Sequence, residues 1–426
     1  MNKRIIVLIS GLALLITKIQ AQDSFYLDDC VKLAIANYAG TRSIALYKDA
    51  EEYKLKSANS AYLPKLNLNA QASWQSQTTT IDLSSLPFPI NIDPPPKDQY
   101  KAVLEINQLI FDAGATKQLK AIQQKEIEVN SSSVKVEQYK LEEQIMMFFL
   151  NILFLNKQIG INHTFMELLD QKLIKVKSGV ENGVLLASNL DLLKVEIIKT
   201  EQQLLSLQYK KKTLIESLAL LCAKEMKENA VFIVPEFEPS AGIFGRPEEN
   251  VFDARNALIE ENIKLLTTRR LPKLISFGQF GYGRPGLNFF STEFEPYVYV
   301  GAALTWNIWD WNQVKNEKQY LQVQKELVRI QREIYNQNME LLRINEINNR
   351  EYYFDALNKS IQMVELRKKI SGTASSQLDN GIITASDYLT ELTAEKQAIM
   401  ELELNKLLLL QSQLNLELII GKKQNY

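Results

Sequence analysis

The chain has 426 residues, a formal net charge of −1 and 23% charged residues, so it has no basic excess of the kind that suits nucleic acid. Only two cysteines and one histidine are present, which leaves no disulfide framework and no spacing typical of a metal site. We therefore expect a protein that binds neither nucleic acid nor a metal ion and that needs no cofactor.

The N-terminus predicts a secretory signal. Lys3 and Arg4 precede an apolar run over residues 5–16, and the small residue Ala21 follows it. The run is short for a membrane span and is followed by Lys18, which argues against the alternative of a single anchor. We expect cleavage near Ala21, which removes three basic residues and shifts the formal charge from −1 to about −4. No later stretch approaches about 18 unbroken apolar residues, so we expect no transmembrane helix in the mature chain.

A helix is expected from Leu27 to about Leu63, because Pro64 would end it. Two strands should follow, since apolar and polar residues then alternate. Their apolar faces would carry Leu66, Leu68, Ala70, Ala72 and Trp74 in the first strand, and Ala102, Leu104 and Ile106 in the second. Between the strands, residues 78–99 are rich in Thr, Ser, Pro and Asp and predict a surface loop.

From residue 113 to about 177 there is no proline, which predicts a helix of roughly 65 residues and, at ~1.5 Å per residue, a length of ~100 Å. A turn at Asn182-Gly183-Val184 separates it from a second helix. That second helix has apolar positions at alternating steps of three and four, which is coiled-coil spacing. The positions are Leu190, Leu193, Ile197, Thr200, Leu204, Leu207, Lys211, Leu214, Leu218 and Leu221.

The whole pattern then repeats. The turn sequence recurs as Asn380-Gly381-Ile382, and Phe111-Asp112 recurs as Trp309-Asp310, both 198 residues later. Leu63-Pro64 recurs as Leu271-Pro272 after 208 residues, so the first half holds ten extra residues before Asp112, which fit in its longer loop. We expect two structural repeats, residues 22–225 and 247–426, joined by a connector over residues 226–246.

The second half shows the same elements with two weaker patterns. Its first strand, Lys273 to Gly283, alternates poorly, and its three glycines predict a bulge or bend. Its return helix has a less regular seam, in which three of ten positions are polar. Those positions are Leu389, Leu392, Lys396, Ile399, Leu402, Lys406, Leu409, Gln413, Leu416 and Ile420.

Strands with one apolar face are ambiguous, because a soluble sandwich shows the same alternation. Four strands cannot close a barrel wide enough for a channel, whereas three chains would supply twelve and leave no open edge in lipid. Four tryptophans at or near the strand ends suit a membrane interface, although they would also suit a core. They are Trp74, Trp306, Trp309 and Trp311.

No pattern in the chain predicts catalysis, so we do not expect an enzyme. Glu142-Glu143 and Asp28-Asp29 are adjacent pairs that point to different faces of a helix. His163 lies alone on a long helix. Asp112 and Asp310 stand where a strand gives way to a long helix, and we interpret both as N-caps. Whether Cys30 and Cys222 are free thiols is left open.

The signal, the duplication, the Leu-Pro-x-Leu segments, the aspartates before the long helices and the Asn-Gly turns together resemble the outer membrane efflux protein family, the TolC-like channel-tunnels. The resemblance covers nearly all of the mature chain. It implies a mixed, mainly α fold with long antiparallel helical hairpins that form an α-barrel tunnel. It also implies a homotrimer with a twelve-stranded β-barrel in outer-membrane lipid, extending into the periplasm.

The same resemblance implies a passive exit duct for a tripartite efflux pump or a type I secretion system. The duct would join a periplasmic adaptor and an inner-membrane pump or ABC transporter. The two turns would contact the adaptor through Asn182, Gly183, Val184, Asn380, Gly381 and Ile382. Asp387 would form a selectivity ring at a gated entrance, with Thr390 where the family has a second aspartate, and with Asn189 as its counterpart in the first half.

Two other classes of protein remain as alternatives. A periplasmic adaptor also has long hairpins, although usually only one, flanked by small domains. An exported coiled-coil structural protein would have the helices without a pore. Neither alternative accounts for the duplicated strand pairs, and the identity of the transported substrate is left open.

Overall fold

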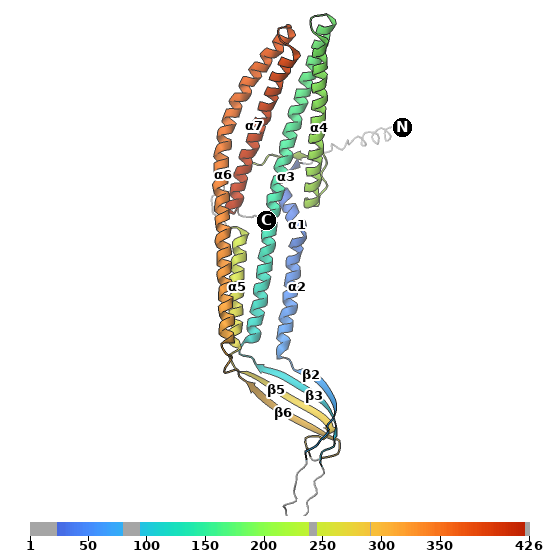
Figure 1. Ribbon diagram of the computed structural model, residues 1–426, viewed down its shortest axis with the longest axis vertical. Coiled ribbons are helices and arrows are strands. Elements are labelled where there is room, and N and C mark those ends of the chain that lie inside the picture. Colours follow the sequence, from blue (N-terminus) through green and yellow to red (C-terminus); the bar gives the residue numbers. More distant parts are fainter. Residues whose placement is uncertain (1–23, 80–93, 238–244, 290, 422–426) are drawn as a thin grey trace, which may run out of the picture. The chain divides into compact units, whose positions relative to one another are not determined.

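The computed structural model describes residues 24–79, 94–237, 245–289 and 291–421 (Figure 1). The expected signal and most of the expected loop at residues 78–99 lie outside these ranges. The chain forms two compact units. The hairpin unit comprises Met1–Thr41, Glu137–Arg246 and Gln337–Tyr426, and the sheet unit comprises Arg42–Val136 and Pro247–Asn336. Each unit takes segments from both repeats.

The sheet unit contains one four-stranded antiparallel sheet in the order β2-β3-β5-β6 (Figure 1). Its strands are β2 (Lys65–Trp74), β3 (Asp98–Phe111), β5 (Lys273–Arg284) and β6 (Glu295–Thr305). The register keeps the alternation in phase across the sheet. One face carries the row Leu68, Leu104, Phe280, Val298, and the other carries the row Asn67, Glu105, Gln279, Tyr299. The expected strand pairs are therefore confirmed.

The expected bulge at the glycines of β5 is wrong. Pairing of β5 with both neighbours is continuous across Gly278, Gly281 and Gly283, and the one register shift in these ladders falls in β3 between Leu109 and Phe111. Gly281 and Gly283 instead make room for atoms of the adjacent strands. A Cβ on Gly281 would lie 2.0 Å from the ring of Tyr297, so a side chain there would displace that ring.

Four helical segments complete the sheet unit. They belong to α2 (Ala39–Asn59), α5 (Pro247–Thr268), α3 (Ala115–Glu181) and α6 (Gln313–Asp379). Ion pairs join them two by two. Lys54 of α2 lies 3.2 Å from Glu126 of α3, and Lys325 of α6 lies 2.6 Å from Glu260 of α5.

The helix expected from Leu27 to Leu63 is divided. It consists of α1 (Leu27–Asn37), α2 and a short 3-10 turn, η1 (Ser60–Tyr62). Tyr38 separates α1 from α2 because its backbone is extended, with ψ at 125°. Gly40 lies two residues further on, and a Cβ there would lie 2.2 Å from the ring of Tyr38, so this glycine was a local signal for the break.

The hairpin unit contains α1, α4 (Ala187–Cys222), α7 (Ala385–Ile420) and the remaining parts of α3 and α6. Two short strands, β1 (Ser24–Phe25) and β4 (Val231–Phe232), pair in parallel at its core, where Phe25 and Phe232 stack 5.6 Å apart. The connector thus supplies a strand and a core residue rather than a surface link alone. All ten expected seam positions of α4 are buried or half-buried, which confirms the heptad pattern.

One helix in the described part of the chain, α3, contains an 18-residue window whose length and composition would suit a membrane span. Its apolar stretch includes Ile145, Phe149 and Ile152, and these side chains are buried in the core of the hairpin unit. A core helix passes the same compositional test, so this window is weak evidence for a span.

The two repeats match in length and in register. The helices α3 and α6 each have 67 residues, and α4 and α7 each have 36. In the sheet, Leu66 pairs with Ile106, and the equivalent residues Leu274 and Leu304 also pair. The offsets of 208 and 198 residues found in the sequence therefore hold as structural equivalences.

Candidate functional site at the helical turns

Each hairpin of the hairpin unit ends in the same type of turn. Gly183 and Gly381 have φ of 74° and 71°, a left-handed conformation that glycine adopts without strain. The amide of Val184 donates to the carbonyl of Gly179 at 2.8 Å. The amide of Ile382 donates to the carbonyl of Gln377 at 2.9 Å. These bonds are the Schellman pattern that ends a helix, so the Asn-Gly pairs fix where α3 and α6 stop.

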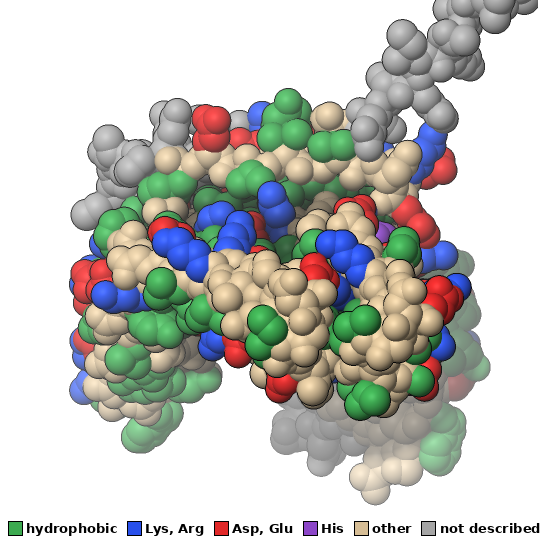
Figure 2. All heavy atoms as spheres, turned by 90° about the horizontal axis from the view of Figure 1, so that it is seen from above, with side chains coloured by type: hydrophobic (Ala, Val, Ile, Leu, Met, Phe, Trp, Pro, Cys, Tyr) green, Lys and Arg blue, Asp and Glu red, His purple; other side chains and the backbone are tan. Residues whose placement is uncertain are grey.

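The two turns lie side by side. A Cβ on Gly381 would be 3.8 Å from Cγ1 of Val184, which joins the turns of the two repeats. Val184 and Ile382 are 67% and 69% exposed. Seen end-on, this end of the hairpin unit shows mostly uncharged polar side chains and backbone, with isolated hydrophobic side chains among them (Figure 2). The predicted adaptor-contacting residues therefore include two accessible apolar side chains.

Asp387 has an exposed side chain and a structural role in the first turn of α7. Its carboxylate accepts hydrogen bonds from the hydroxyl of Thr384 at 2.7 Å and from the amide of Thr384 at 3.0 Å. The amide of Asp387 in turn donates to the Thr384 hydroxyl at 3.2 Å, which completes a capping box. The hydroxyl and the amide of Thr384 hold the pKa of Asp387 below its usual range, so its carboxylate is charged at neutral pH.

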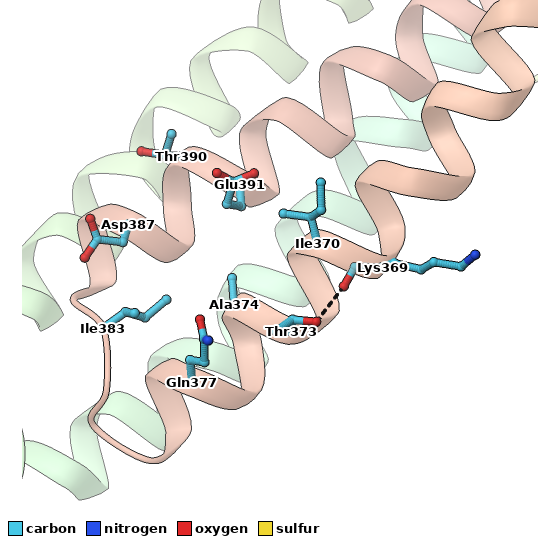
Figure 3. A pocket seen from close by; sticks show the side chains of 9 residues that line it. All are labelled: Lys369, Ile370, Thr373, Ala374, Gln377, Ile383, Asp387, Thr390 and Glu391. Carbon is cyan, nitrogen blue, oxygen red and sulfur yellow. Dashed lines mark hydrogen bonds between the residues drawn. The ribbon is translucent and has the colours of Figure 1, made fainter.

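Asp387 and Thr390 line a shallow groove of about 510 Å³ between α6 and α7. Figure 3 shows Ile383, Asp387, Thr390 and Glu391 on one side of this groove, opposite side chains of α6. The facing side chains are Lys369, Ile370, Thr373, Ala374 and Gln377. Lys369 pairs with Glu365 of its own helix at 2.9 Å and Glu391 pairs with Arg367 at 3.1 Å, whereas Asp387 bonds to the uncharged Thr384.

Asn189 does not share this exposed surface. It is 7% exposed, and its Oδ1 accepts a hydrogen bond at 3.1 Å from the amide of Ala385. Asn189 thus satisfies a free amide at the start of α7 and ties the first repeat to the second. The family resemblance implies Asn189 as the counterpart of Asp387 in the gate. In the structure, Asn189 instead forms a contact between the two hairpins.

A buried ion pair near the turns was missed by the sequence patterns. Lys172 of α3 is 4% exposed, and its Nζ lies 2.8 Å from Oδ1 of Asp379 and 2.7 Å from Oγ of Ser375, both on α6. The same ammonium lies 4.9 Å from the ring centre of Tyr388 on α7. One side chain therefore joins three helices. The sequence feature that could have revealed this ion pair is a lysine on the apolar stripe of α3, between Leu169 and Val176.

The protonation states of the groups around Lys172 follow from burial and from neighbouring charges. Burial alone would raise the pKa of Asp379, but hydrogen bonds and charge from Lys172, with a smaller effect of Lys175, hold it below its usual range. Burial, together with the carboxylates of Asp379 and Glu395, raises the pKa of Tyr388 to about 12. At neutral pH the cluster is thus an ammonium, a carboxylate and a neutral phenol.

Asp112 and Asp310 lie in the sheet unit, at the two strand-to-helix junctions. Asp112 accepts from the amides of Gly114 at 3.0 Å and Thr116 at 2.7 Å, and Asp310 accepts from those of Asn312 at 3.1 Å and Val314 at 3.2 Å. Both residues after each aspartate have positive φ, which leaves the first amides of α3 and α6 pointing at the carboxylate.

Within the described residues, no group of three or more His, Cys, Asp and Glu side chains could hold a metal ion. His163 is exposed on α3. The candidate site is therefore a surface of turns, a carboxylate groove and a buried ion pair, with the chemistry of recognition and ion attraction.

Comparison with known proteins agrees with this arrangement. Residues 31–222 match the family model described as outer membrane efflux protein. None of the curated proteins matches the sequence. Solved structures share the fold over 93% of this chain. The outer membrane protein VceC of Vibrio cholerae has a TM-score of 0.70 at 13% identity and is covered over 96% of its length. CusC has 0.73 at 12% identity and 92% coverage. The open-state outer membrane channel MtrE of Neisseria gonorrhoeae has 0.67 at 14% identity and 88% coverage.

Proposed function

We infer that this chain, which belongs to the outer membrane efflux protein family, is a passive exit duct that becomes a closed channel only as a trimer. The family places it in the outer membrane, extending into the periplasm. The observation that carries the trimer is the sheet with two open edges. Every residue of the edge strand β2 is exposed, and β6 is unpaired on its outer side within the described residues.

Closure of such a sheet removes edges that lipid cannot satisfy. The apolar rows would face lipid and the polar rows the lumen. Three copies would supply twelve strands, which is wide enough for a water-filled channel. An adaptor or a coiled-coil tether has no use for a sheet of this kind, so the sheet favours the duct over both.

The helices next to the edge strands support the same closure. On α6, exposed apolar side chains recur at steps of three and four, which is an unpartnered coiled-coil seam. They are Tyr320, Val323, Leu327, Ile330 and Ile334. On α2, Leu46 and Tyr53 are 66% and 70% exposed and lie one heptad apart. We propose that α6 of one copy packs on α2 of the next.

The repeat predicts the register of the joint between copies. Within one chain the repeats meet where β3 pairs with β5, with Leu104 opposite Phe280. The equivalent joint between copies pairs β6 with β2 and sets Ala302 opposite Ala72. A chain with Ala72→Cys and Ala302→Cys, with both native cysteines replaced by serine, should form covalent trimers on oxidation.

The matched control replaces Ala303 instead of Ala302. Ala303 points to the opposite face of β6, so Ala72→Cys with Ala303→Cys should stay largely monomeric on a denaturing gel. Equal cross-linking of both pairs would contradict the register. In planar bilayers the purified trimer should conduct ions. A protein that is monomeric in several detergents and conducts no ions would contradict the proposed duct.

We further propose that the turns receive a periplasmic adaptor and that the entrance is gated there. Val184 and Ile382 provide apolar contacts at the two turns, and three copies would present six such turns in one ring. Asp387 of each copy would contribute to an acidic constriction that attracts cations. Energy for transport would come from a partner, an inner-membrane pump or an ABC transporter.

A further inference from the structure

The two cysteines of the chain come together in the core of the hairpin unit. Cys30 lies in the first turn of α1 and Cys222 is the last residue of α4, 192 residues away. Both are 0% exposed. The thiol of Cys222 donates a hydrogen bond to the carbonyl oxygen of Cys30, with 3.4 Å between Sγ and O. A chain with only two cysteines has brought both to one point.

The backbones that carry the thiols are held in place by other contacts. Asn37 of α1 donates from Nδ2 to the carbonyl of Cys222 at 3.1 Å. The amide of Ile233 donates to the carbonyl of Phe25 at 3.0 Å, beside the β1–β4 pair. The bond from Asn37 holds α1 against the end of α4 independently of any sulfur chemistry, so the two thiols stay adjacent, as a disulfide of roughly 2.05 Å requires.

We propose that Cys30 and Cys222 form an intramolecular disulfide in the exported protein. Export from the cytoplasm exposes the chain to an oxidising compartment, where paired thiols are oxidised and persist as disulfides. The inference needs only export, and it would hold for a chain that conducts nothing.

The bond forms by thiol–disulfide exchange with a disulfide-bearing oxidant protein. One cysteine thiolate attacks the oxidant's disulfide and forms a mixed disulfide, and the second thiolate then displaces the oxidant's sulfur. Two electrons pass to the oxidant, which leaves as a dithiol after taking up two protons, and the two cysteine thiols lose theirs. Both thiols are fully buried in the folded protein and out of reach of an oxidant protein, so exchange precedes the final burial of this pair.

The disulfide would tie the N-terminal segment to the body of the hairpin unit. Residues 30 to 222 span α1, α2, the first strand pair and the first hairpin, so one covalent bond would close nearly the whole first repeat. Its effect would fall mainly on the unfolded chain, whose freedom a long closed loop restricts.

The test uses the full chain purified from outer membranes, denatured in guanidinium and treated with a maleimide-linked polyethylene glycol of about 5 kDa. We expect no adduct without prior reduction and two adducts after dithiothreitol. Cys30→Ser and Cys222→Ser should each take one adduct without reduction, because the remaining thiol loses its partner. Two adducts on the unreduced wild type would overturn the proposal, as would an intermolecular disulfide seen as a dimer on a non-reducing gel.

A second measurement separates the bond from the mere presence of two thiols. The unfolding temperature of the wild type should fall on reduction, to a value near that of the Cys30→Ser/Cys222→Ser chain. An unchanged temperature, together with the two-adduct result, would show a packed dithiol instead.

Discussion

Asp387 combines two roles in one side chain. Its carboxylate completes the capping box with Thr384, and its charge faces the groove between α6 and α7. Because both recorded hydrogen bonds from Thr384 fall on Oδ2, an amide could keep them while losing the charge. This separates the structural role from the electrostatic one.

Asp387→Asn should therefore lower the cation selectivity of the channel and its block by multivalent cations, with little change in thermal stability. Reversal potentials in a salt gradient and cation titrations in planar bilayers measure both effects. The lowered pKa of Asp387 means that the carboxylate stays charged as pH falls, so wild-type selectivity should hold from pH 7 down to about 4, the usual range for aspartate.

The control for this experiment is Asp191→Asn, on the exposed surface of α4 next to Lys194. It removes the same charge outside the groove and should leave selectivity unchanged. If Asp387→Asn also leaves cation selectivity unchanged, the proposal that a ring of Asp387 carboxylates sets selectivity is wrong.

Replacing Lys172 should lower the stability of the turn end of the hairpin unit rather than that of the whole protein. Lys172→Met removes the bond to Asp379 but keeps the apolar stem, and should destabilise the end of the hairpin unit by about 1–3 kcal/mol, since hydrogen bonds to charged groups are worth this much. Amide hydrogen exchange near residues 172–190 should then speed up by roughly 5- to 150-fold.

Lys175→Met is the matched control. Lys175 pairs with the same carboxylate at 3.3 Å but is 64% exposed, so it should change exchange by less than about 1 kcal/mol. The lowered pKa of Asp379 gives the sign of the pH effect: its contribution is present above pH ~4 and is lost as pH falls through the folded pKa. Equal effects of the two lysines would contradict the importance of burial.

Single residues were the least predictable part of the site. The turns and Asp387 could be found because Asn-Gly and the repeat mark them locally. Asn189 and Lys172 could not, since their partners Ala385 and Asp379 are about 200 residues away and only packing brings them together. A polar residue on an apolar stripe was the one available hint.

At the scale of elements, Gly283 offers a sharp test of the sheet. A Cβ there would lie 2.7 Å from the carbonyl oxygen of Tyr100 on β3, and that backbone atom cannot move aside without breaking the ladder. Gly283→Ala should cost about 1–3 kcal/mol and lower the thermal stability of the assembled protein. The shift in the temperature at which the folded form disappears on a gel measures it.

Gly278→Ala in the same strand is the control. Its Cβ would meet nothing closer than Cγ1 of Val300 at 4.0 Å, so it should be neutral or slightly stabilising. If both variants behave alike, the close approach of β3 and β5 at Gly283 is not what the structure indicates.

Elements were predictable where one physical signal dominates. The absence of proline set the long helices, and alternation set the strands. The break at Tyr38 and the shift in β3 near Leu109 were not predicted, although Gly40 lies two residues after Tyr38 and marks the break locally. The bulge expected at the glycines of β5 was wrong because Gly281 and Gly283 face a ring and backbone atoms of adjacent strands.

At the scale of the whole molecule, the repeats and the compact units divide the chain differently. Each unit contains segments of both repeats, so the repeats do not form separate compact units. The sequence revealed the duplication through its spacing. The division into units could not be predicted, because it depends on which segments of α3 and α6 contact which neighbours.

Equal hairpin lengths predict the effect of shortening one of them. Deleting seven residues from each of α6 and α7 keeps the heptad phase but shortens one hairpin by ~10.5 Å at ~1.5 Å per residue. The turns would no longer lie side by side, so export with the cognate pump should be lost while trimers still form. Matched deletions in α3 and α4 as well should restore the level ring. Export by the unequal form would show that the alignment of the turns is unimportant.

The pairing of β3 with β5 determines the symmetry expected of the proposed trimer. It is the joint between two similar halves, and the proposed joint of β6 with β2 between copies is its equivalent, so a trimer would approximate a hexamer of half-chains. In a true hexamer every unit has the same sequence, and a charge placed at the entrance appears six times. Fusion of two halves into one chain allows alternate units to differ. Here the odd units present Asn189, which binds a neighbouring helix, and the even units present Asp387. In the proposed trimer, fusion of the halves would let the entrance carry three charges while the other three positions join the two hairpins within each copy.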